Sequence, residues 1–180
     1  MNLPNFLTVL RILMIPFFTF FFYPTASRSS ITAAAIFLLA SLTDILDGYF
    51  ARRRSEVTQF GKFLDPVADK LLIVSALILL VGNGRVPAWM AIVIIGREFA
   101  VTGFRAIASS EGIVIASEGT GKYKMFLQIV AITFLIIELP SFYFHQIGLL
   151  LLLLSMFLAL YSAGQYFFKF GRRINLLKVK

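Results

Sequence analysis

The strongest constraint on this chain is that long apolar segments recur along its whole length, separated by short breaks rich in proline, glycine and charge. A helix needs about 20 residues to cross the hydrocarbon core of a bilayer. We therefore expect an all-α, polytopic membrane protein that forms one domain over residues 1–180. Its six transmembrane helices are predicted at 5–23, 31–52, 64–82, 87–107, 123–139 and 146–168.

The composition excludes most other classes of protein. Hydrophobic residues make up 59% of the chain and charged residues 14%, whereas soluble domains average about 45–50% and about 25%. Because the chain has no cysteine, a disulfide scaffold, a thiolate nucleophile and a zinc–thiolate site are excluded. No small-residue cleavage site follows the first apolar segment cleanly, so we expect a mature transmembrane helix there rather than a signal peptide.

Lysine and arginine are distributed unevenly between the two sides of such a protein. The segments 52–62, 105–124 and 169–180 carry twelve of these residues, while the alternate loops carry only Arg28 and Arg85. Because basic residues accumulate on the cytoplasmic side of membrane proteins, both termini are predicted to face the cytoplasm. The net charge of +8 then reflects topology and contact with anionic membrane lipid. No nucleic-acid partner is expected, since no soluble fold presents a basic face.

Several charged residues fall inside the predicted spans, where a charge near the bilayer centre is costly. All of them lie in the cytoplasmic halves of their spans, so charges of both signs meet at similar depth. This pattern predicts a polar cavity that opens to the cytoplasm. Its charged members are Arg11, Asp44, Asp47, Asp65, Asp69, Arg97 and Glu98.

Four of these residues are aspartates on two consecutive, antiparallel helices. Asp44 and Asp47 lie about 60° apart on one helical face, and Asp65 and Asp69 about 40° apart on the next. Carboxylate oxygens suit hard cations such as Mg²⁺ or Mn²⁺. Two such ions about 4 Å apart form the clamp used in phosphoryl-group displacement.

The aspartates alone leave other interpretations open. They would also serve as a proton or sodium relay in a transporter. They could equally be neutralised by ion pairing within the cavity, with the basic residues Arg11, Arg52, Lys70 and Arg97.

The spacing of the aspartates is more specific than their number. The segment reads Asp-x-x-Asp-Gly-x-x-Ala-Arg, then eight residues, then Gly-x-x-x-Asp-x-x-x-Asp. This pattern resembles the defining motif of the CDP-alcohol phosphatidyltransferase family, whose six-helix membrane fold opens its active site to the cytoplasm. The matching positions are Asp44, Asp47, Gly48, Ala51, Arg52, Gly61, Asp65 and Asp69.

Three further segments resemble the bacterial phosphatidylglycerophosphate synthase branch of that family. They are the N-terminal residues 2–11, the segment 97–105 and the Gly-Lys-Tyr-Lys run at 121–124. Met125 is a small departure, because threonine is expected after the second lysine. The resemblance covers essentially the whole chain and implies a multi-pass protein of the bacterial inner (cytoplasmic) membrane. A homodimer is expected from the resemblance alone.

The resemblance also implies roles for individual residues. CDP-diacylglycerol is the expected donor, and two Mg²⁺ or Mn²⁺ ions are expected at Asp44, Asp47 and Asp65, with Asp69 completing the second site. Asp69 is the expected general base. For the first helix an amphipathic entry segment at the membrane interface is an equal alternative to donor binding. The expected donor-binding residues are Asn5, Thr8, Arg11, Gly48, Ala51, Arg52 and Gly61.

A second, basic cluster indicates the acceptor. Arg97, Arg105, Lys122 and Lys124 bring four cations to the cytoplasmic ends of the fourth and fifth spans, and such groups hold phosphate monoesters. Glycerol 3-phosphate is therefore the expected acceptor. Simple membrane anchoring would also explain the two lysines, and Glu98 could pair with a neighbouring cation. The acceptors of cardiolipin, phosphatidylserine and inositol-phosphate synthases remain alternatives within the family.

The predicted topology can be checked with single cysteines, since the chain has none of its own. A cysteine at position 145 should react with a membrane-impermeant maleimide added outside the cell, because this position precedes the sixth predicted span. A cysteine at position 56 should react only after the membrane is opened. The opposite labelling pattern would contradict a cytoplasmic cavity.

Overall fold

The computed structural model describes residues 3–23, 27–54, 59–110, 120–137 and 142–171. Within α2 and α3 the side chains of 44–54, 59–66 and Asp69 lie outside this description, as do those of Asn5 and Lys122. The described residues form helices and no strands. The helices are α1 (Leu3–Phe22), α2 (Ser27–Arg54), α3 (Gln59–Gly82), α4 (Ala88–Ser110), α5 (Thr120–Ile136) and α6 (Phe142–Gly171).

Each predicted apolar segment corresponds to one helix, so the all-α fold class is confirmed for the described residues. The helices extend beyond several predicted spans because polar residues continue the helical backbone past the apolar run. We expected His145 to precede the sixth helix, because the predicted span begins at 146. α6 instead begins at Phe142, so His145 lies in its first turn.

The apolar run of one helix, Tyr143–Phe168, is long enough to cross a bilayer by itself. The apolar runs Thr8–Phe22, Ser30–Thr43, Lys70–Gly82 and Tyr123–Ile136 are shorter. These lengths refer to the described residues alone, and Arg11 lies inside the first of the shorter runs. Six membrane spans therefore remain a prediction.

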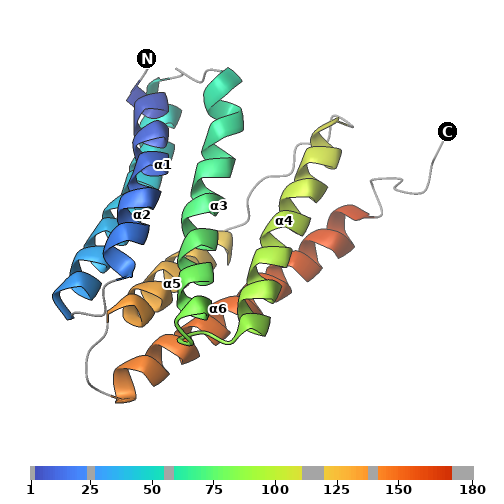
Figure 1. Ribbon diagram of the computed structural model, residues 1–180. Coiled ribbons are helices and arrows are strands. Elements are labelled where there is room, and N and C mark those ends of the chain that lie inside the picture. Colours follow the sequence, from blue (N-terminus) through green and yellow to red (C-terminus); the bar gives the residue numbers. More distant parts are fainter. Residues whose placement is uncertain (1–2, 24–26, 55–58, 111–119, 138–141, 172–180) are drawn as a thin grey trace.

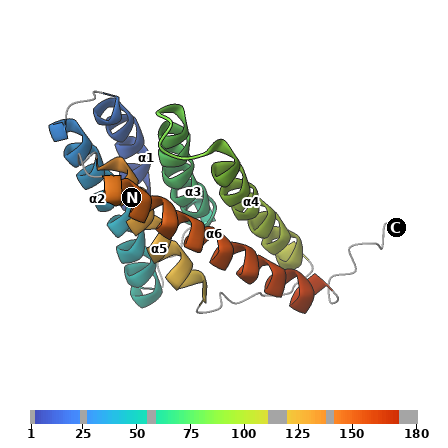
Figure 2. The ribbon, with the colours of Figure 1, turned by 90° about the horizontal axis from the view of Figure 1, so that it is seen from below.

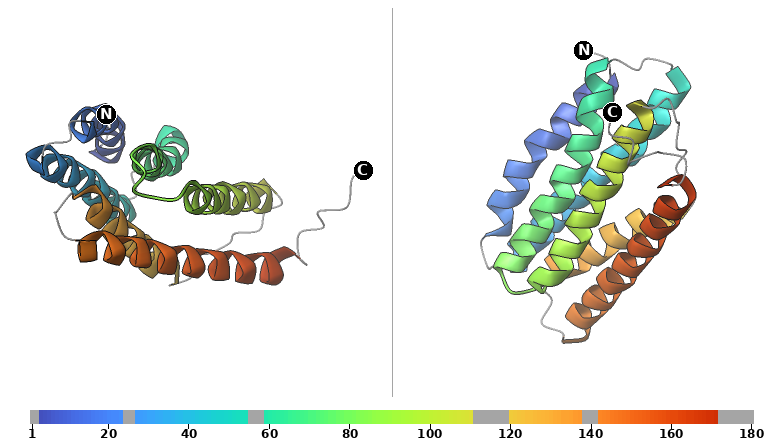
Figure 3. Two further views of the ribbon diagram at one scale, coloured as in Figure 1. Left: turned by 60° about the horizontal axis from the view of Figure 1, so that its bottom comes forward. Right: turned by 90° about the vertical axis from the view of Figure 1, so that its right-hand side faces the viewer.

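The helices run alternately up and down, so that particular ends gather together (Figure 1). The N-terminal end of α1, the last turns of α2, the first turns of α3 and the last turns of α4 all lie at the top in this view. α1, α2 and α3 stand side by side, whereas α5 and α6 cross on one side of the other helices (Figures 2 and 3). This arrangement brings four helix ends to one end of the bundle.

The core cluster draws buried residues from each of the helices α1 to α6. Phe18 on α1 is fully buried, and its ring centroid lies 5.7 Å from that of Phe22 and 5.8 Å from that of Phe37 on α2. Leu77 on α3 and Ile132 on α5 are also fully buried in the same cluster. Burying such a side chain contributes roughly 1.5–3 kcal/mol, and this packing fixes the frame that carries the polar residues.

Many large apolar side chains point outward instead. Phe20 on α1, Ile92 on α4 and Phe168 on α6 are 72%, 69% and 82% exposed. Soluble monomers rarely expose large contiguous apolar patches, and lipid is the solvent that such a surface suits.

A glycine allows α5 and α6 to approach closely. A Cβ atom added to Gly148 would lie 2.9 Å from the Leu135 side chain. Beside it the rings of Phe134 and Phe144 stack with their centroids 4.5 Å apart. This close contact fixes the angle at which α5 and α6 cross, and so the position of the α5 residues described below.

Arg85, on the side with few basic residues, caps a helix. The chain leaves α3 through Gly84, whose φ of 67° is the left-handed conformation that glycine adopts freely. The Arg85 guanidinium then donates hydrogen bonds to the carbonyls of Leu135 (3.2 Å) and Ile136 (2.9 Å) at the end of α5. It also lies 5.7 Å from the centroid of the Phe22 ring. A cation at a helix C-terminus satisfies carbonyls that have no partner within the helix.

We expect Arg85→Met to lower the free energy of unfolding by about 1–3 kcal/mol, because buried carbonyls lose a charged donor. Asn83→Ala, at an exposed position of the same turn, is the matched control and should change little. Thermal unfolding of the detergent-purified protein measures both. Equal melting temperatures for the two variants would show that the cap contributes nothing.

Candidate functional site

The aspartate motif falls at the end of the bundle where the four helix ends gather. Its first half, residues 44–52, forms the end of α2, and its second half, 61–69, lies in the first part of α3 (Figure 1). The helical backbone places the members of each aspartate pair within one turn of each other, as the spacing predicts. The structure describes none of the motif side chains, so the ligand set itself remains a prediction.

Two polar residues of the first helix are buried. Thr8 is 0% exposed and Arg11 is 1% exposed, although both lie on a helix with apolar neighbours. An amphipathic entry helix at the membrane interface would leave these side chains at its surface. Their burial favours the other interpretation, in which they belong to a polar interior.

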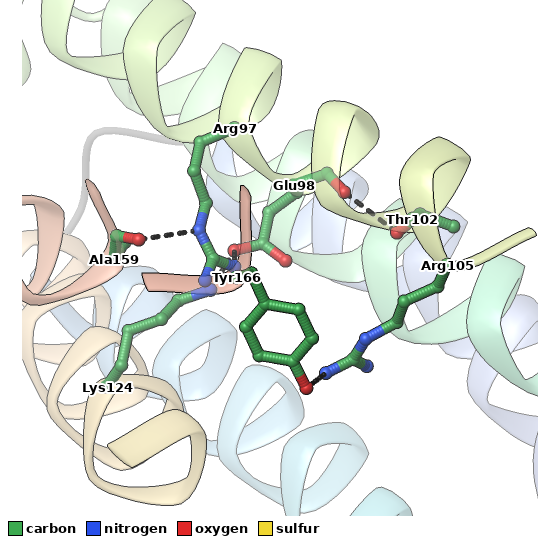
Figure 4. Close-up of polar contacts among 7 residues, drawn as sticks. All are labelled: Arg97, Glu98, Thr102, Arg105, Lys124, Ala159 and Tyr166. Carbon is green, nitrogen blue, oxygen red and sulfur yellow. Dashed lines mark hydrogen bonds and ion pairs between the residues drawn. The ribbon is translucent and has the colours of Figure 1, made fainter. Parts of the chain in front are cut away.

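A polar cluster joins α4, α5 and α6 (Figure 4). The Arg97 Nη1 atom lies 3.1 Å from Glu98 Oε1, and Lys124 Nζ on α5 forms an ion pair with the same oxygen. The three side chains are 9%, 21% and 8% exposed for Arg97, Glu98 and Lys124 respectively. Buried charges are stable only when paired, and here one carboxylate pairs with two cations.

The backbone holds this ion pair in place. Arg97 Nε donates a hydrogen bond to the Ala159 carbonyl on α6 at 2.8 Å. On α4 the Thr102 hydroxyl donates to the Glu98 carbonyl one turn earlier, at 2.8 Å. The Arg97 guanidinium is therefore fixed to a neighbouring helix independently of Glu98.

Arg105 lies two turns further along α4 and meets a tyrosine on α6. Its Nη2 atom donates to the Tyr166 hydroxyl at 2.8 Å, and its guanidinium carbon lies 5.0 Å from the centre of the Tyr166 ring. Tyr166 is 3% exposed. Sequence reasoning missed this residue, although a tyrosine at the same depth as Arg105 in the sixth span was an available signal.

Of the four residues expected to hold the acceptor phosphate, the structure brings Arg97, Arg105 and Lys124 to one junction (Figure 4). The side chain of Lys122 lies outside the described residues. Lys124 is buried, at 6% exposure, so membrane anchoring does not explain it. The expected pairing of Glu98 with a neighbouring cation is confirmed.

A second polar residue on α5 was also missed. Gln128 follows Lys124 by one helical turn and is 4% exposed. Within the described part of the chain its Nε2 atom has no hydrogen-bond partner. Buried amides are nearly always hydrogen-bonded, so this donor marks a place where a polar ligand group could bind.

The cluster has the charge of a dianion site. Arg97, Arg105 and Lys124 each carry +1, and Glu98 carries −1, which leaves a net charge of +2. A phosphate monoester carries about −1.5 to −2 at neutral pH. The junction of α4, α5 and α6 can therefore neutralise one phosphate monoester.

Comparison with known proteins agrees with this chemistry. A family model described as CDP-alcohol phosphatidyltransferase matches residues 1–161. That range includes the aspartate motif and every basic residue of the junction, and Tyr166 lies beyond it.

Curated bacterial relatives are similar over nearly the full length. The protein named CDP-diacylglycerol–glycerol-3-phosphate 3-phosphatidyltransferase in Bacillus subtilis is 42% identical over 185 residues, covering 93% of this chain and 94% of its own. Proteins of the same name in Pseudomonas fluorescens and Rickettsia felis are 41% and 37% identical. Those alignments cover 92% of this chain in both cases, and 88% and 93% of the relatives.

Proposed function

This chain belongs to the CDP-alcohol phosphatidyltransferase family, and we propose that it transfers the phosphatidyl group of CDP-diacylglycerol to glycerol 3-phosphate. The products are phosphatidylglycerophosphate and CMP. The observation that carries the choice of acceptor is the basic junction of Arg97, Arg105 and Lys124, in which the side chains of Arg97 and Lys124 are only 9% and 8% exposed. The relatives' printed name describes the same reaction.

The acceptor phosphate binds at this junction. Arginine forks and a lysine point charge hold a phosphate monoester better than any neutral alcohol. Serine or choline, the acceptors of other family members, would not use a cluster of three cations, two of them with buried side chains. The Nε2 donor of Gln128 lies on the same face of α5 as Lys124 and supports a polar pocket that also receives the acceptor's hydroxyl groups.

The donor's pyrophosphate belongs at the aspartate motif. The donor set fits hard divalent cations, because four carboxylates stand on two helices that reach the same end of the bundle. Asp44, Asp47, Asp65 and Asp69 would hold two Mg²⁺ or Mn²⁺ ions. When bound, these ions supply positive charge that neutralises the pyrophosphate and stabilises the departing CMP.

The remaining donor contacts come from small and polar residues. Gly48, Ala51 and Gly61 leave room for the nucleotide, and Arg52 pairs with phosphate. Asn5, Thr8 and Arg11 on α1 line the nucleotide side. The burial of Thr8 and Arg11 supports this placement.

The reaction is a single in-line displacement. The acceptor's terminal hydroxyl oxygen forms a bond to the phosphatidyl phosphorus, and the bond from that phosphorus to the CMP oxygen breaks. Asp69 takes the proton of the attacking hydroxyl. The junction of α4, α5 and α6 orients the acceptor by its phosphate, which raises the effective concentration of the hydroxyl at the phosphorus.

The membrane arrangement forms part of the same proposal. Six spans in the bacterial inner membrane, with both termini in the cytoplasm, would expose the cavity to glycerol 3-phosphate and CMP while the donor's acyl chains remain in lipid. The outward apolar side chains support this placement. A homodimer rests on the family resemblance alone.

The proposed reaction is tested by CMP release from the purified protein with CDP-diacylglycerol and a panel of acceptors. Glycerol 3-phosphate with Mg²⁺ or Mn²⁺ should give turnover, whereas serine and inositol phosphate should not. Activity should disappear in EDTA and return when metal is added. Equal turnover with serine would overturn the assigned acceptor, and full turnover in EDTA would overturn the metal assignment.

Two substitutions separate the chemistry from acceptor recognition. Asp69→Asn keeps the side-chain shape but loses the proton acceptor, so turnover should fall by roughly 10²–10⁴-fold. Arg105→Ala removes one charge-assisted contact, which should weaken apparent acceptor affinity about 10- to 150-fold. Saturation curves for donor and acceptor measure both effects.

Ser110→Ala, at an exposed position on the same helix as Arg105, is the control and should leave both curves unchanged. If Arg105→Ala weakens the donor and spares the acceptor, the basic junction is not the acceptor site.

A further inference from the structure

Glu98 forms ion pairs with two of the cations that are proposed to bind the acceptor phosphate. Two of the three cations at the junction contact the same carboxylate oxygen, Glu98 Oε1. The Glu98 side chain is also more exposed than its two partners, at 21% against 9% and 8%. Among the three side chains joined by the ion pairs, the carboxylate of Glu98 is thus the most exposed.

The two arginines have contacts that do not depend on the carboxylate. Arg97 Nε keeps its hydrogen bond to the Ala159 carbonyl whichever anion it meets, and Arg105 is held by Tyr166 (Figure 4). Departure of Glu98 would therefore leave both guanidinium groups in place. A phosphate entering beside an unmoved Glu98 would instead meet a like charge at short range, which is unfavourable.

We propose that Glu98 is a resident anion that the acceptor must displace from Arg97 and Lys124, and that this exchange makes Glu98 a specificity-determining residue. The inference rests on the proposed function, since it assumes that a phosphorylated acceptor binds at the junction. Without acceptor, Glu98 neutralises two buried cations. With acceptor, the phosphate replaces it.

The exchange selects ligands by charge. A monoanion that displaces Glu98 only replaces one single negative charge by another and gains little. A phosphate dianion brings a second negative charge to the three cations that remain, and it gains the additional attraction. Neutral glycerol cannot displace Glu98 at all. The Glu98 carboxylate therefore lowers the affinity of the junction for every anion, and it lowers the affinity most for ligands of low charge.

The test compares Glu98→Gln with wild type and with Ser110→Ala, a control at an exposed position of α4 that loses only a hydroxyl bond to the Ile107 carbonyl. With saturating CDP-diacylglycerol and metal, the KM for glycerol 3-phosphate should fall about 3- to 10-fold in Glu98→Gln, with kcat little changed. Inhibition by glycerate, a monoanion, should strengthen more than inhibition by inorganic phosphate. Ser110→Ala should behave as wild type.

Binding without turnover provides the second measurement. Glu98→Gln should melt at a lower temperature than wild type when acceptor is absent, because two cations lose their partner. Glycerol 3-phosphate should then raise its melting temperature by more than it raises that of wild type.

If Glu98→Gln does not fold, Glu98→Asp keeps the charge but shortens its reach by one methylene. Glu98→Asp should lower the KM for glycerol 3-phosphate by a smaller factor than is expected for Glu98→Gln.

The outcomes separate the two claims. If wild type releases CMP with glycerol 3-phosphate but KM rises or stays constant in both Glu98 variants, Glu98 is a structural partner and the exchange is wrong. The exchange is also wrong if glycerol 3-phosphate raises the melting temperature of Glu98→Gln by less than it raises that of wild type. If wild type gives no glycerol-3-phosphate-dependent release, the proposed function itself fails.

Discussion

Charge placed inside an apolar helix bundle must be neutralised where it lies, and the ion pairs of Glu98 meet that requirement for two cations together. Glu98 comes from α4 and Lys124 from α5, and Arg97 reaches the backbone of α6 at Ala159. These contacts join α4, α5 and α6, which could otherwise pack against one another in several rotational orientations. Arg97 and Lys124, two of the residues proposed to bind phosphate, owe their positions to this junction.

The need to pair a buried charge also explains why arginine has two different roles in this protein. Arg85 and Arg97 both donate to backbone carbonyls of a neighbouring helix. Arg85 donates to two carbonyl oxygens at the end of α5 and lies over an aromatic ring, so it caps α5. Arg97 meets a carboxylate as well. Because a carboxylate can be exchanged for another anion while a helix carbonyl cannot, only the second arginine is suited to ligand binding.

The proposed reaction needs a donor site and an acceptor site within reach of one another. The motif segments of α2 and α3 lie at the end of the bundle where the last turns of α4 also lie (Figure 1). In the proposed reaction, donor and acceptor recognition come from different helices. The aspartates belong to the α2–α3 pair, and the cations proposed to hold phosphate belong to α4 and α5. Such a division allows the acceptor to change within a family while the transfer chemistry is kept.

The sequence alone determined the six helices, because apolar runs and their breaks depend on local composition, and helical spacing determined which aspartates share a face. It also identified the basic residues of the junction by their depth. It did not identify Tyr166, Gln128 or the carbonyls that Arg85 caps, and it left the burial of Lys124 undecided. Those facts depend on how each helix is rotated against its neighbours. Periodicity fixes the faces of a helix, but only packing decides which faces meet across 26 to 62 residues of chain.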